Sequence, residues 1–312
     1  MNLFAVFNRD GGTFRTTDMS AYCAHATKTF EAAGHQIECH VVSGDKVVET
    51  MERAASTNGI DALIAGGGDG TISSAARIAW KGQIALGVVP AGTMNLFARS
   101  LKLPLDIWEV LDALAVAVPE NIDIASANGQ SFVHQFSAGL HARMVRYRNS
   151  MDFASRLGKM RASMRAAVGV MFNPPEFEVE FTMDGKTGYR KVSAISVSNN
   201  EFGRDPLMYA DDLTRGHLGF YIAEPLKPAG VARLTFDILR GRLKESASVT
   251  AMTATQLELH FPRHRHDVRC VIDGELLPMK RDVLLKIHAG ELKVLVNSVH
   301  GQEARDLLDN AR

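Results

Sequence analysis

One short stretch, Ala65–Thr71, combines residue types that could handle a phosphate group. It follows the apolar run Asp61–Ile64, which predicts a buried strand, and precedes Ile72–Trp80, which predicts a helix with one apolar face. Its consecutive glycines permit positive φ angles and leave no side chain in the way of a ligand, and a helix N-terminus offers unpaired N–H groups to an anion. Asp69 is unusual there, because a carboxylate repels a phosphate unless a divalent cation or a reacting hydroxyl lies between them. The stretch therefore predicts phosphoryl transfer rather than simple anion binding.

Two further stretches follow predicted strands in the same half of the chain. The glycines of Asn8–Thr13 could let the backbone approach a phosphate, but an ordinary turn also explains them and is favoured from the residues alone. Val89–Arg99 predicts another strand, turn and helix. In it Thr93 could donate to a phosphate or cap the helix, with capping favoured, and Asn95 could hold a substrate or the turn.

The fourth stretch, Val271–Glu275, lies far downstream. Its Asp273-Gly274 pair predicts a two-residue hairpin turn. Glu275 also forms a carboxylate pair with Asp273, which could serve as a base and a metal ligand. From these residues alone the plain hairpin is the favoured interpretation.

Residues 1–122 alternate strand-like and helix-like segments. The expected strands are 3–8, 36–42, 61–65 and 84–89, and the expected helices are 21–33, 46–55, 72–80, one after Pro90–Thr93, and 106–118. Repeated strand–helix units predict a parallel sheet covered by helices, with ligands at the carboxyl ends of the strands. Because each glycine-rich turn follows a strand, we expect these turns to converge on that one edge.

From about Ile122 the pattern changes to short alternating segments. The expected strands are 122–125, 132–136, 177–183, 191–197, 218–223, 248–252, 256–261, 268–272, 283–287 and 292–296. Turn signals at Asn128-Gly129, Asp184-Gly185 and Asp273-Gly274 separate several of them. This texture predicts a mainly antiparallel sandwich or barrel, interrupted by helical insertions at 141–171 and 229–240 and followed by a short helix at 302–311. The expected domains are 1–122 (α/β, parallel sheet), 123–298 (β-sandwich) and a C-terminal helix in 299–312.

The overall composition excludes some classes of function. The chain has 312 residues with 35 basic and 35 acidic side chains, so no global field favours nucleic acid as a partner. The three cysteines are widely spaced and show no metal or disulfide pattern, as expected in a reducing compartment. The N-terminus shows no signal-peptide pattern, and no apolar run approaches the roughly 20 residues of a membrane span. We therefore expect a cytoplasmic protein that would meet a lipid only from the inner membrane surface.

Taken together, Gly67–Thr71, Pro90–Asn95 and Asp273–Glu275 resemble the diacylglycerol kinase catalytic-domain family, which includes bacterial lipid kinases, sphingosine kinases and ceramide kinases. The segments 122–139 and 196–200 also look like those of the family, so that the resemblance covers nearly the whole chain. The glycine–aspartate motif alone is shared with NAD kinases and phosphofructokinases. The Pro-x-Gly-Thr-x-Asn stretch with the Phe-Ala-Arg that follows it favours the lipid kinases.

The resemblance implies a nucleotide-binding α/β domain, a lipid-binding β-sandwich domain, and ATP with Mg²⁺ in the cleft between them. The residues that match the nucleotide-binding positions are Asn8, Arg9, Asp10, Gly11, Gly12, Ser43, Gly67, Gly68, Asp69, Gly70, Thr71 and Thr93. Asp69 matches a residue that acts through Mg²⁺. Glu275 matches the proton acceptor, with Asp273 beside it, and such a base takes the proton of a lipid hydroxyl as it attacks the γ-phosphoryl group.

The activity implied is that of an ATP-dependent lipid kinase with a diacylglycerol-like acceptor. A ceramide or sphingoid-base kinase is the alternative within the family, and an NAD kinase is a weaker enzymatic one. A lipid- or nucleotide-binding protein without catalysis is the alternative from another class. It is supported by the departures from the family pattern, whereas the retained Asp69, Asp273 and Glu275 oppose it.

Three departures stand out. Arg9-Asp10-Gly11 replaces the usual Pro-x-Ser, and Ser73-Ser74 replaces the usual Asn-Glu after the glycine motif. In the turn Leu213–Gly216, Arg215 replaces an aspartate that in bacterial members helps to bind a structural cation. We hypothesise that the guanidinium substitutes for that cation and pairs with Asp211 or Asp212.

The segment 143–165 is strongly basic. Only Asp152 is acidic between His141 and Ala167, and methionine and aromatic residues are interleaved. Its basic residues are Arg143, Arg146, Arg148, Arg156, Lys159, Arg161 and Arg165. A basic helix with an adaptable apolar face predicts binding to an anionic membrane surface, and a solvated face with core contacts is an equally favoured interpretation.

Overall fold

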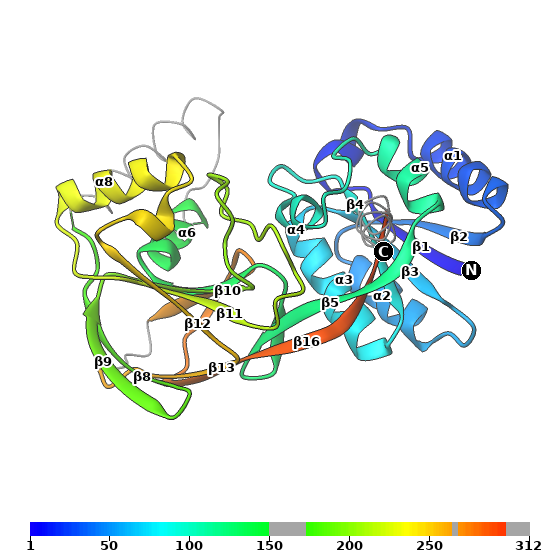
Figure 1. Cartoon of the computed structure of the whole chain (residues 1–312). Helices are drawn as coiled ribbons and strands as arrows, with labels where there is room; N and C mark the ends of the chain where they lie inside the picture. The colour runs from blue at the N-terminus through cyan, green and yellow to red at the C-terminus, as the bar shows by residue number, and fades with distance from the viewer. Residues whose placement is uncertain (150–172, 264–267, 298–312) are drawn as a thin grey trace, which may run out of the picture. The chain divides into compact units, whose positions relative to one another are not determined.

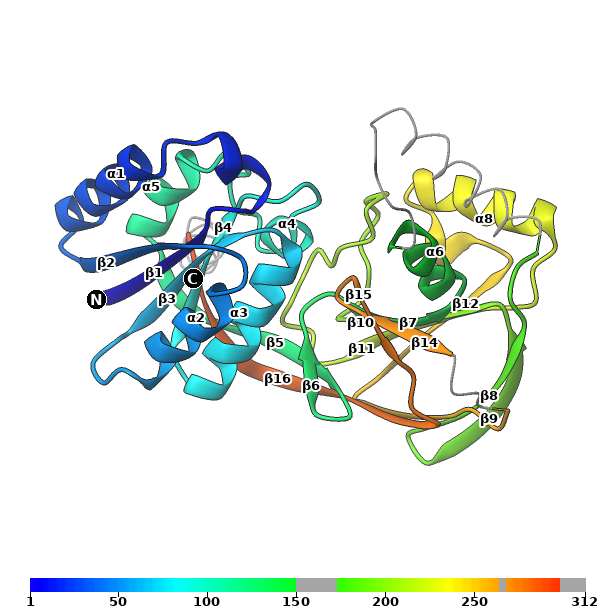
Figure 2. The same ribbon diagram turned by 180° about the vertical axis from the view of Figure 1, so that it is seen from behind.

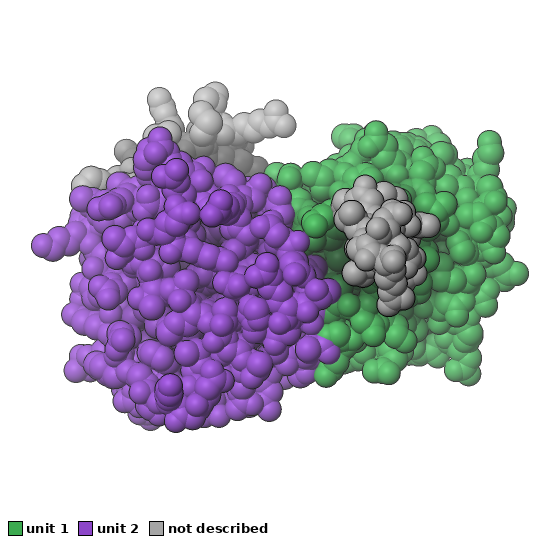
Figure 3. Space-filling view, viewed as in Figure 1, with its two compact units in different colours: residues 1–122, 290–312 green, residues 123–289 purple. Residues whose placement is uncertain are grey.

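The computed structural model describes residues 1–149, 173–263 and 268–297. Two compact units make up the chain (Figure 3): unit 1 contains residues 1–122 and 290–297 of this described part, and unit 2 contains its residues from 123 to 289. Residues 290–297, which were predicted to belong to the second domain, therefore belong to unit 1. The reason is that β16 (Asp282–Val296) is one continuous strand that starts in unit 2 and ends in unit 1, and an uninterrupted strand carries no local signal of such a crossing.

Unit 1 is the predicted parallel α/β layer structure. Its elements are β1 (Asn2–Asn8), the 3-10 helix η1 (Gly12–Thr16), α1 (Met19–Ala32), β2 (Gln36–Val42), α2 (Val47–Ser56), β3 (Ala62–Gly67), α3 (Asp69–Gly82), β4 (Ala85–Pro90), α4 (Leu96–Ser100) and α5 (Glu109–Ala115). The strand order is β2-β1-β3-β4, all parallel, and the end of β16 adds one more parallel strand beside β4.

Helices cover both faces of this sheet, α1 and α5 on one and α2 and α3 on the other (Figure 1). Every residue of β3 and β4 is consequently buried, which explains why these strands are continuous apolar runs. Helix α3 turns Ile72, Ala75 and Ile78 toward the sheet. The spacing of its apolar residues predicted this face.

Unit 2 is the predicted antiparallel sandwich. Its elements are β5 (Val118–Ala127, which begins in unit 1), β6 (Gln130–Phe132), β7 (Gln135–Gly139), α6 (Leu140–Asn149), β8 (Phe177–Met183), β9 (Lys186–Val192), β10 (Ala194–Asn199), β11 (Leu218–Ala223), α8 (Pro228–Leu239), η2 (Leu243–Glu245), β12 (Val249–Ala254), β13 (Gln256–His260), β14 (Arg269–Ile272), β15 (Glu275–Pro278) and β16. One sheet has the order β12-β11-β10-β7-β14-β15, and the other contains β16-β13-β8-β9 (Figure 2).

Alternate residues of the two sheets meet in one core. Phe136, Val197 and Phe220 from one sheet and Phe181 and Leu257 from the other belong to a single buried cluster. This arrangement explains the alternating pattern of the sequence, since a sandwich strand turns every second side chain inward.

The three expected hairpin turns are confirmed. Both residues of each turn have positive φ: 50° and 82° at Asn128-Gly129, 51° and 74° at Asp184-Gly185, and 45° and 84° at Asp273-Gly274. Such angles define type I′ turns, which Asn-Gly and Asp-Gly favour. The expected strand at 191–197 is instead the end of β9 and most of β10. Strand pairing is interrupted at Ser193, because β9 pairs with β8 in one sheet and β10 pairs with β7 and β11 in the other.

Some sequence predictions fall on residues that the structure does not describe. The predicted helix at 229–240 is confirmed as α8, whereas of the predicted helix at 141–171 only α6 lies in the described part. Residues 150–172 and the predicted helix at 302–311 lie outside it. Within the described residues, no helix has both the length and the apolar character needed to cross a bilayer.

Candidate nucleotide and catalytic site

The turns after β1, β3 and β4 lie so close together that their glycines face the backbone atoms of the neighbouring turn. A Cβ atom on Gly12 would lie 2.1 Å from the carbonyl oxygen of Ala91, and one on Gly92 would lie 2.7 Å from the Cα atom of Gly68. Real Cβ atoms do not approach other atoms so closely, so glycine is required at both positions. The predicted convergence of the glycine-rich turns on one sheet edge is thus confirmed.

Polar side chains tie the first turn to its neighbours. The Nδ2 atom of Asn8 donates to Oγ1 of Thr71 (3.3 Å), and its Oδ1 accepts from the N–H of Asp10 (3.0 Å). Asp10 in turn accepts the N–H of Gly44, in the turn after β2, at 2.8 Å. Gly44 was not predicted to take part, although a glycine two residues after a predicted strand was the available signal.

Asp69 connects the turn after β3 to the turn after β4. As the first residue of α3, it accepts the N–H of Leu96 on Oδ1 at 2.7 Å and the N–H of Asn95 on Oδ2 at 3.1 Å. It therefore satisfies two amides at the start of α4, which would otherwise lack partners. A carboxylate has about four lone-pair sites, so Asp69 keeps acceptor capacity for a further ligand. Its action through Mg²⁺ stays a prediction.

Asn95 and Thr93 have different roles from each other in the third turn. Asn95 is the N-cap residue of α4, with φ 51° and ψ 44°. Its Oδ1 accepts from the N–H of Gly92 at 2.9 Å and its Nδ2 donates to the carbonyl of Gly92 at 3.1 Å, so it holds the turn. Thr93 is exposed and is not the cap, because Asp69 already satisfies the helix start. Its hydroxyl is available to a ligand, as the resemblance implies.

The remaining predicted nucleotide residues line the same edge. Ser43 follows β2, and its hydrogen bond to Asp45 holds the pKa of that exposed carboxyl below its usual value. Arg9 is exposed, and its N–H donates to the carbonyl of Val42 at 3.0 Å. The predicted nucleotide-binding residues of unit 1 thus lie at the carboxyl ends of β1, β2, β3 and β4 or in the segments that follow them, and the first N–H groups of α3 at this edge are suited to a phosphate.

In unit 2 the two predicted catalytic carboxylates differ in their surroundings. Asp273 accepts three backbone N–H groups: that of Val133 on Oδ2 at 2.9 Å, and those of His134 (2.9 Å) and Gln135 (3.0 Å) on Oδ1. Its own N–H donates to the carbonyl of Gln135 at 3.0 Å. Asp273 therefore fixes the hairpin turn to the start of β7.

Glu275 is the first residue of β15 and is exposed. Within the described residues its carboxylate contacts no hydrogen-bond donor and no cation, in contrast to that of Asp273. Of the two predicted groups, Glu275 is therefore the one whose carboxylate is available to take up a proton. Asp69 belongs to unit 1 and Glu275 to unit 2.

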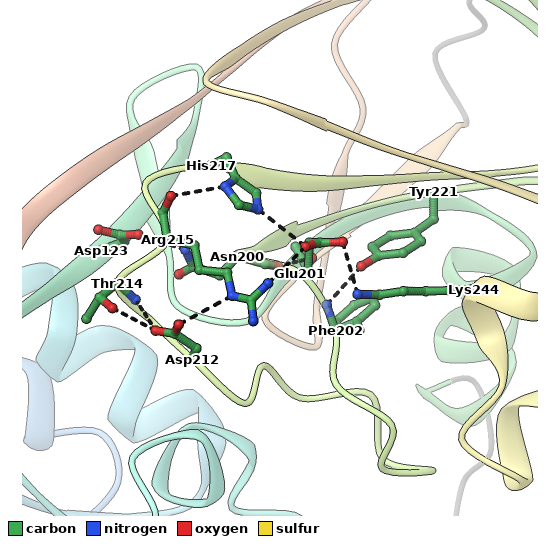
Figure 4. Close-up of polar contacts among 11 residues, drawn as sticks. Asp123, Asn200, Glu201, Phe202, Asp212, Thr214, Arg215, His217, Tyr221 and Lys244 are labelled. Atoms are coloured by element: carbon green, nitrogen blue, oxygen red, sulfur yellow. Dashed lines mark hydrogen bonds and ion pairs between the residues drawn. The ribbon is translucent and has the colours of Figure 1, made fainter. Parts of the chain in front are cut away.

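A network of ion pairs surrounds the turn Leu213–Gly216 in unit 2 (Figure 4). The Nε atom of Arg215 lies 3.3 Å from Oδ2 of Asp212, and its guanidinium lies 3.4 Å from Oε2 of Glu201. The predicted pairing of Arg215 with Asp212 is confirmed, whereas Glu201 was not anticipated. Lys244 (3.0 Å) and His217 (3.4 Å) also contact Glu201, so that two side-chain cations and an imidazole ring enclose this carboxylate.

Beneath this network, Asp123 is almost fully buried. Its Oδ2 accepts from Nδ2 of Asn200 at 2.7 Å and from the N–H of Gly216 at 2.6 Å. This anchoring role of Asp123 was not predicted, although an aspartate between two isoleucines of a predicted strand indicates a buried carboxylate with hydrogen-bond partners.

The pKa of Glu201 leads to a prediction about stability. Burial raises this pKa, but the hydrogen bonds and charges of Lys244 and His217 outweigh burial and hold it below the ordinary value of 4.5. A carboxyl group with a lowered folded-state pKa stabilises the fold above its unfolded pKa and loses that contribution as the pH falls through the folded value. The free energy of unfolding is therefore expected to fall on acidification below 4.5, and to fall less for Glu201→Gln. Urea denaturation of both proteins at successive pH values measures this, and parallel pH profiles would contradict it.

Unit 2 also contains an apolar cavity of about 590 Å³ beside α6. Its apolar lining includes Tyr147, Phe177, Phe261, Val268 and Met279, and its basic lining includes Arg143, Arg146, Arg263 and Arg269. Cavities of this size and composition are typical of sites for small apolar ligands.

Comparisons with known proteins agree with these features. Residues 2–127 match the family described as diacylglycerol kinase catalytic domain. The chain is 27% identical over 264 residues to a diacylglycerol kinase of Bacillus subtilis (strain 168), covering 81% of this chain and 84% of that protein. It is 26% identical over 250 residues to a diacylglycerol kinase of Staphylococcus aureus (strain bovine RF122 / ET3-1), covering 78% of each.

The fold is also similar to solved structures. The crystal structure of a diacylglycerol kinase from Bacillus anthracis str. Sterne superposes with a TM-score of 0.69 at 18% identity, covering 95% of this chain and 97% of that one. Another structure from this organism reaches a TM-score of 0.72 at 19% identity, with 95% of both chains covered. Residues 2–127 therefore form a domain that matches the diacylglycerol kinase catalytic-domain family, and the full chain is similar to bacterial diacylglycerol kinases.

Proposed function

We propose that the protein is an ATP-dependent lipid kinase that phosphorylates a hydroxyl group of a diacylglycerol-like membrane lipid. The observation that carries this proposal is the backbone cradle of unit 1, in which only glycine fits at Gly12 and Gly92 and the N-terminus of α3 is open to a phosphate. The named relatives from Bacillus subtilis and Staphylococcus aureus support the same activity.

The donor set of the cradle is compatible with Mg²⁺ bound to a nucleotide. In kinase sites Mg²⁺ is usually held by one or two carboxylates together with substrate phosphates, and Asp69 retains lone pairs for this purpose. Among the residues that the structure describes, no three His, Cys, Asp or Glu side chains cluster as metal ligands. This fits an ion held largely by the phosphates. When bound, the ion would neutralise charge on the phosphates.

The chain's own groups would then position the reactants. The glycine turns allow the phosphates to lie against the backbone, and the N–H groups at the start of α3 donate to them. Thr93 offers an exposed hydroxyl at the same edge. Glu275, free of side-chain partners in the described part of unit 2, would accept the proton of the lipid hydroxyl as its oxygen attacks the γ-phosphorus.

The apolar cavity of unit 2 supports a lipid as the acceptor. Its aromatic and methionine side chains can surround an acyl chain without polar contacts. Arg143 and Arg263 of its lining contact Asn173 and Glu178. The exposed Arg146 and Arg269 could contact the polar end of the same lipid or of a neighbouring lipid. The apolar lining would not be needed by an enzyme whose acceptor is a dinucleotide.

The test is transfer of labelled γ-phosphate from ATP to a panel of acceptors in mixed micelles: diacylglycerol, ceramide, a sphingoid base and NAD. We expect transfer to diacylglycerol, which both Asp69→Ala and Glu275→Ala abolish. Transfer to ceramide, the sphingoid base or NAD in its place would assign the corresponding alternative activity. ATP binding without transfer to any acceptor would indicate a non-catalytic protein, and transfer that survives both substitutions would refute the proposed site.

A further inference from the structure

Helix α8 in unit 2 has two apolar faces, and only one of them is covered. Val231 and Leu234 are buried in a cluster with Ala223 and Leu226. On the other side Phe236 is 53% exposed and Leu239 is 64% exposed. A surface helix normally presents charged or polar residues to solvent, so two large apolar side chains one turn apart on the uncovered face indicate an interaction surface.

Basic side chains flank these two residues on the same face. Arg233 precedes Phe236 by one turn, and Arg240, the C-cap residue directly after α8, follows it by about one turn, so that both lie near Phe236. The guanidinium of Arg240 lies 4.2 Å from the centre of the Phe236 ring. Both arginines are exposed, and no ion pair to a carboxylate is found for either of them within the described residues. Their charges are therefore available to an anionic partner.

The area of this face argues for a lipid surface rather than a protein. Two partly exposed side chains offer at most about 250 Å² of apolar surface, whereas a stable protein interface buries about 800 Å² on each partner. An interfacial helix needs much less, because aromatic and leucine side chains enter the headgroup boundary while arginines contact lipid phosphates. The combination of Phe236, Leu239 and two exposed guanidinium groups, neither of which has a carboxylate partner in the described part of the chain, matches that chemistry.

We propose that the exposed face of α8, defined as Arg233, Phe236, Leu239 and Arg240, docks on an anionic membrane surface. This inference rests on the proposed function, because an enzyme whose substrate is a membrane lipid must reach the membrane surface. It is independent of the basic segment 143–165, most of which lies outside the described residues. Arg143 of that segment donates to the carbonyl of Asn173 at 2.7 Å and is engaged within the protein.

Co-sedimentation of the full chain with vesicles tests the docking. Wild-type protein is expected to bind vesicles of phosphatidylcholine with phosphatidylglycerol, and to bind vesicles of phosphatidylcholine alone much more weakly. Phe236→Ala with Leu239→Ala, and Arg233→Glu with Arg240→Glu, are each expected to weaken binding to the anionic vesicles by about tenfold or more. Tyr189→Ala with Arg190→Glu is the matched control, because these residues are also exposed but lie on β9.

Two kinase assays separate this proposal from the proposed function. With a short-chain diacylglycerol supplied as monomers, the α8 variants are expected to keep wild-type activity, whereas with diacylglycerol in anionic vesicles they are expected to lose it. No transfer to any lipid, together with α8-dependent vesicle binding, would refute the kinase and leave the docking surface standing. Unchanged vesicle binding by both α8 variants would refute the docking surface. A dimer in light scattering that only these variants dissociate, with vesicle binding unchanged, would assign the face to a second copy of the chain.

Discussion

Glu275→Gln is expected to lower kcat by a factor of about 10²–10⁴, the usual contribution of a general base. Glutamine keeps the size of the side chain but cannot take up a proton. Since Glu275 is exposed at the start of β15, the free energy of unfolding and the KM for ATP are expected to stay close to the wild-type values. Steady-state kinetics and urea denaturation on the same preparations measure both quantities.

Asp273→Asn is the matched variant, because the same hairpin carries both carboxylates. Asp273 accepts three backbone N–H groups, and an amide group would turn its NH₂ toward at least one of these donors. We expect the free energy of unfolding to fall by about 1–3 kcal/mol. Any loss of activity is expected to equal the fraction of the protein that is unfolded. Full activity of Glu275→Gln, or an Asp273→Asn protein that is stable but inactive, would reverse the roles assigned to these two residues.

The second large effect is expected for Asp69→Asn. The substitution preserves the shape of the side chain but replaces one of the oxygens that accept from Asn95 and Leu96 with an NH₂ group. It also removes the negative charge that would attract Mg²⁺. We therefore expect at least about a hundredfold loss of kcat/KM together with a lower Tm. We also expect a higher Mg²⁺ concentration at half-maximal activity.

Asp10→Asn distinguishes these two contributions. Asp10 likewise accepts a backbone N–H at the same sheet edge, that of Gly44 at 2.8 Å, but it does not lie at the start of α3. The Asp10→Asn substitution is expected to lower Tm without changing the Mg²⁺ concentration at half-maximal activity. If Asp69→Asn has the Mg²⁺ dependence of the wild type and loses no more activity than Asp10→Asn, the role of Asp69 is to position the turns alone.

The local features of this fold could be predicted because each depends on neighbours in sequence. Glycines between an apolar strand and an amphipathic helix at Ala65–Trp80 specify a strand–turn–helix unit, whatever surrounds it. The pairs Asn128-Gly129 and Asp184-Gly185 specify type I′ turns, because these residue types tolerate positive φ. Parallel order then brings the turns to one edge, so that their convergence could also be predicted.

Partners distant in sequence could not be predicted in the same way. Lys244 and Glu201 are 43 residues apart, and Asp69 and Leu96 are 27 apart, so no local pattern links either pair. Nor does a continuous strand such as β16 show where it passes from one unit to the other. These features depend on how the whole chain folds back on itself.

The sequence by itself determined the two-domain class, the glycine-rich turns and the candidate carboxylates Asp69, Asp273 and Glu275. Only the tertiary structure decided what surrounds each carboxylate. It assigned Asp69 and Asp273 to backbone amides and left Glu275 exposed. The physical reason is that a carboxylate's chemistry depends on the donors and charges around it, and these come from segments that meet only when the chain has folded.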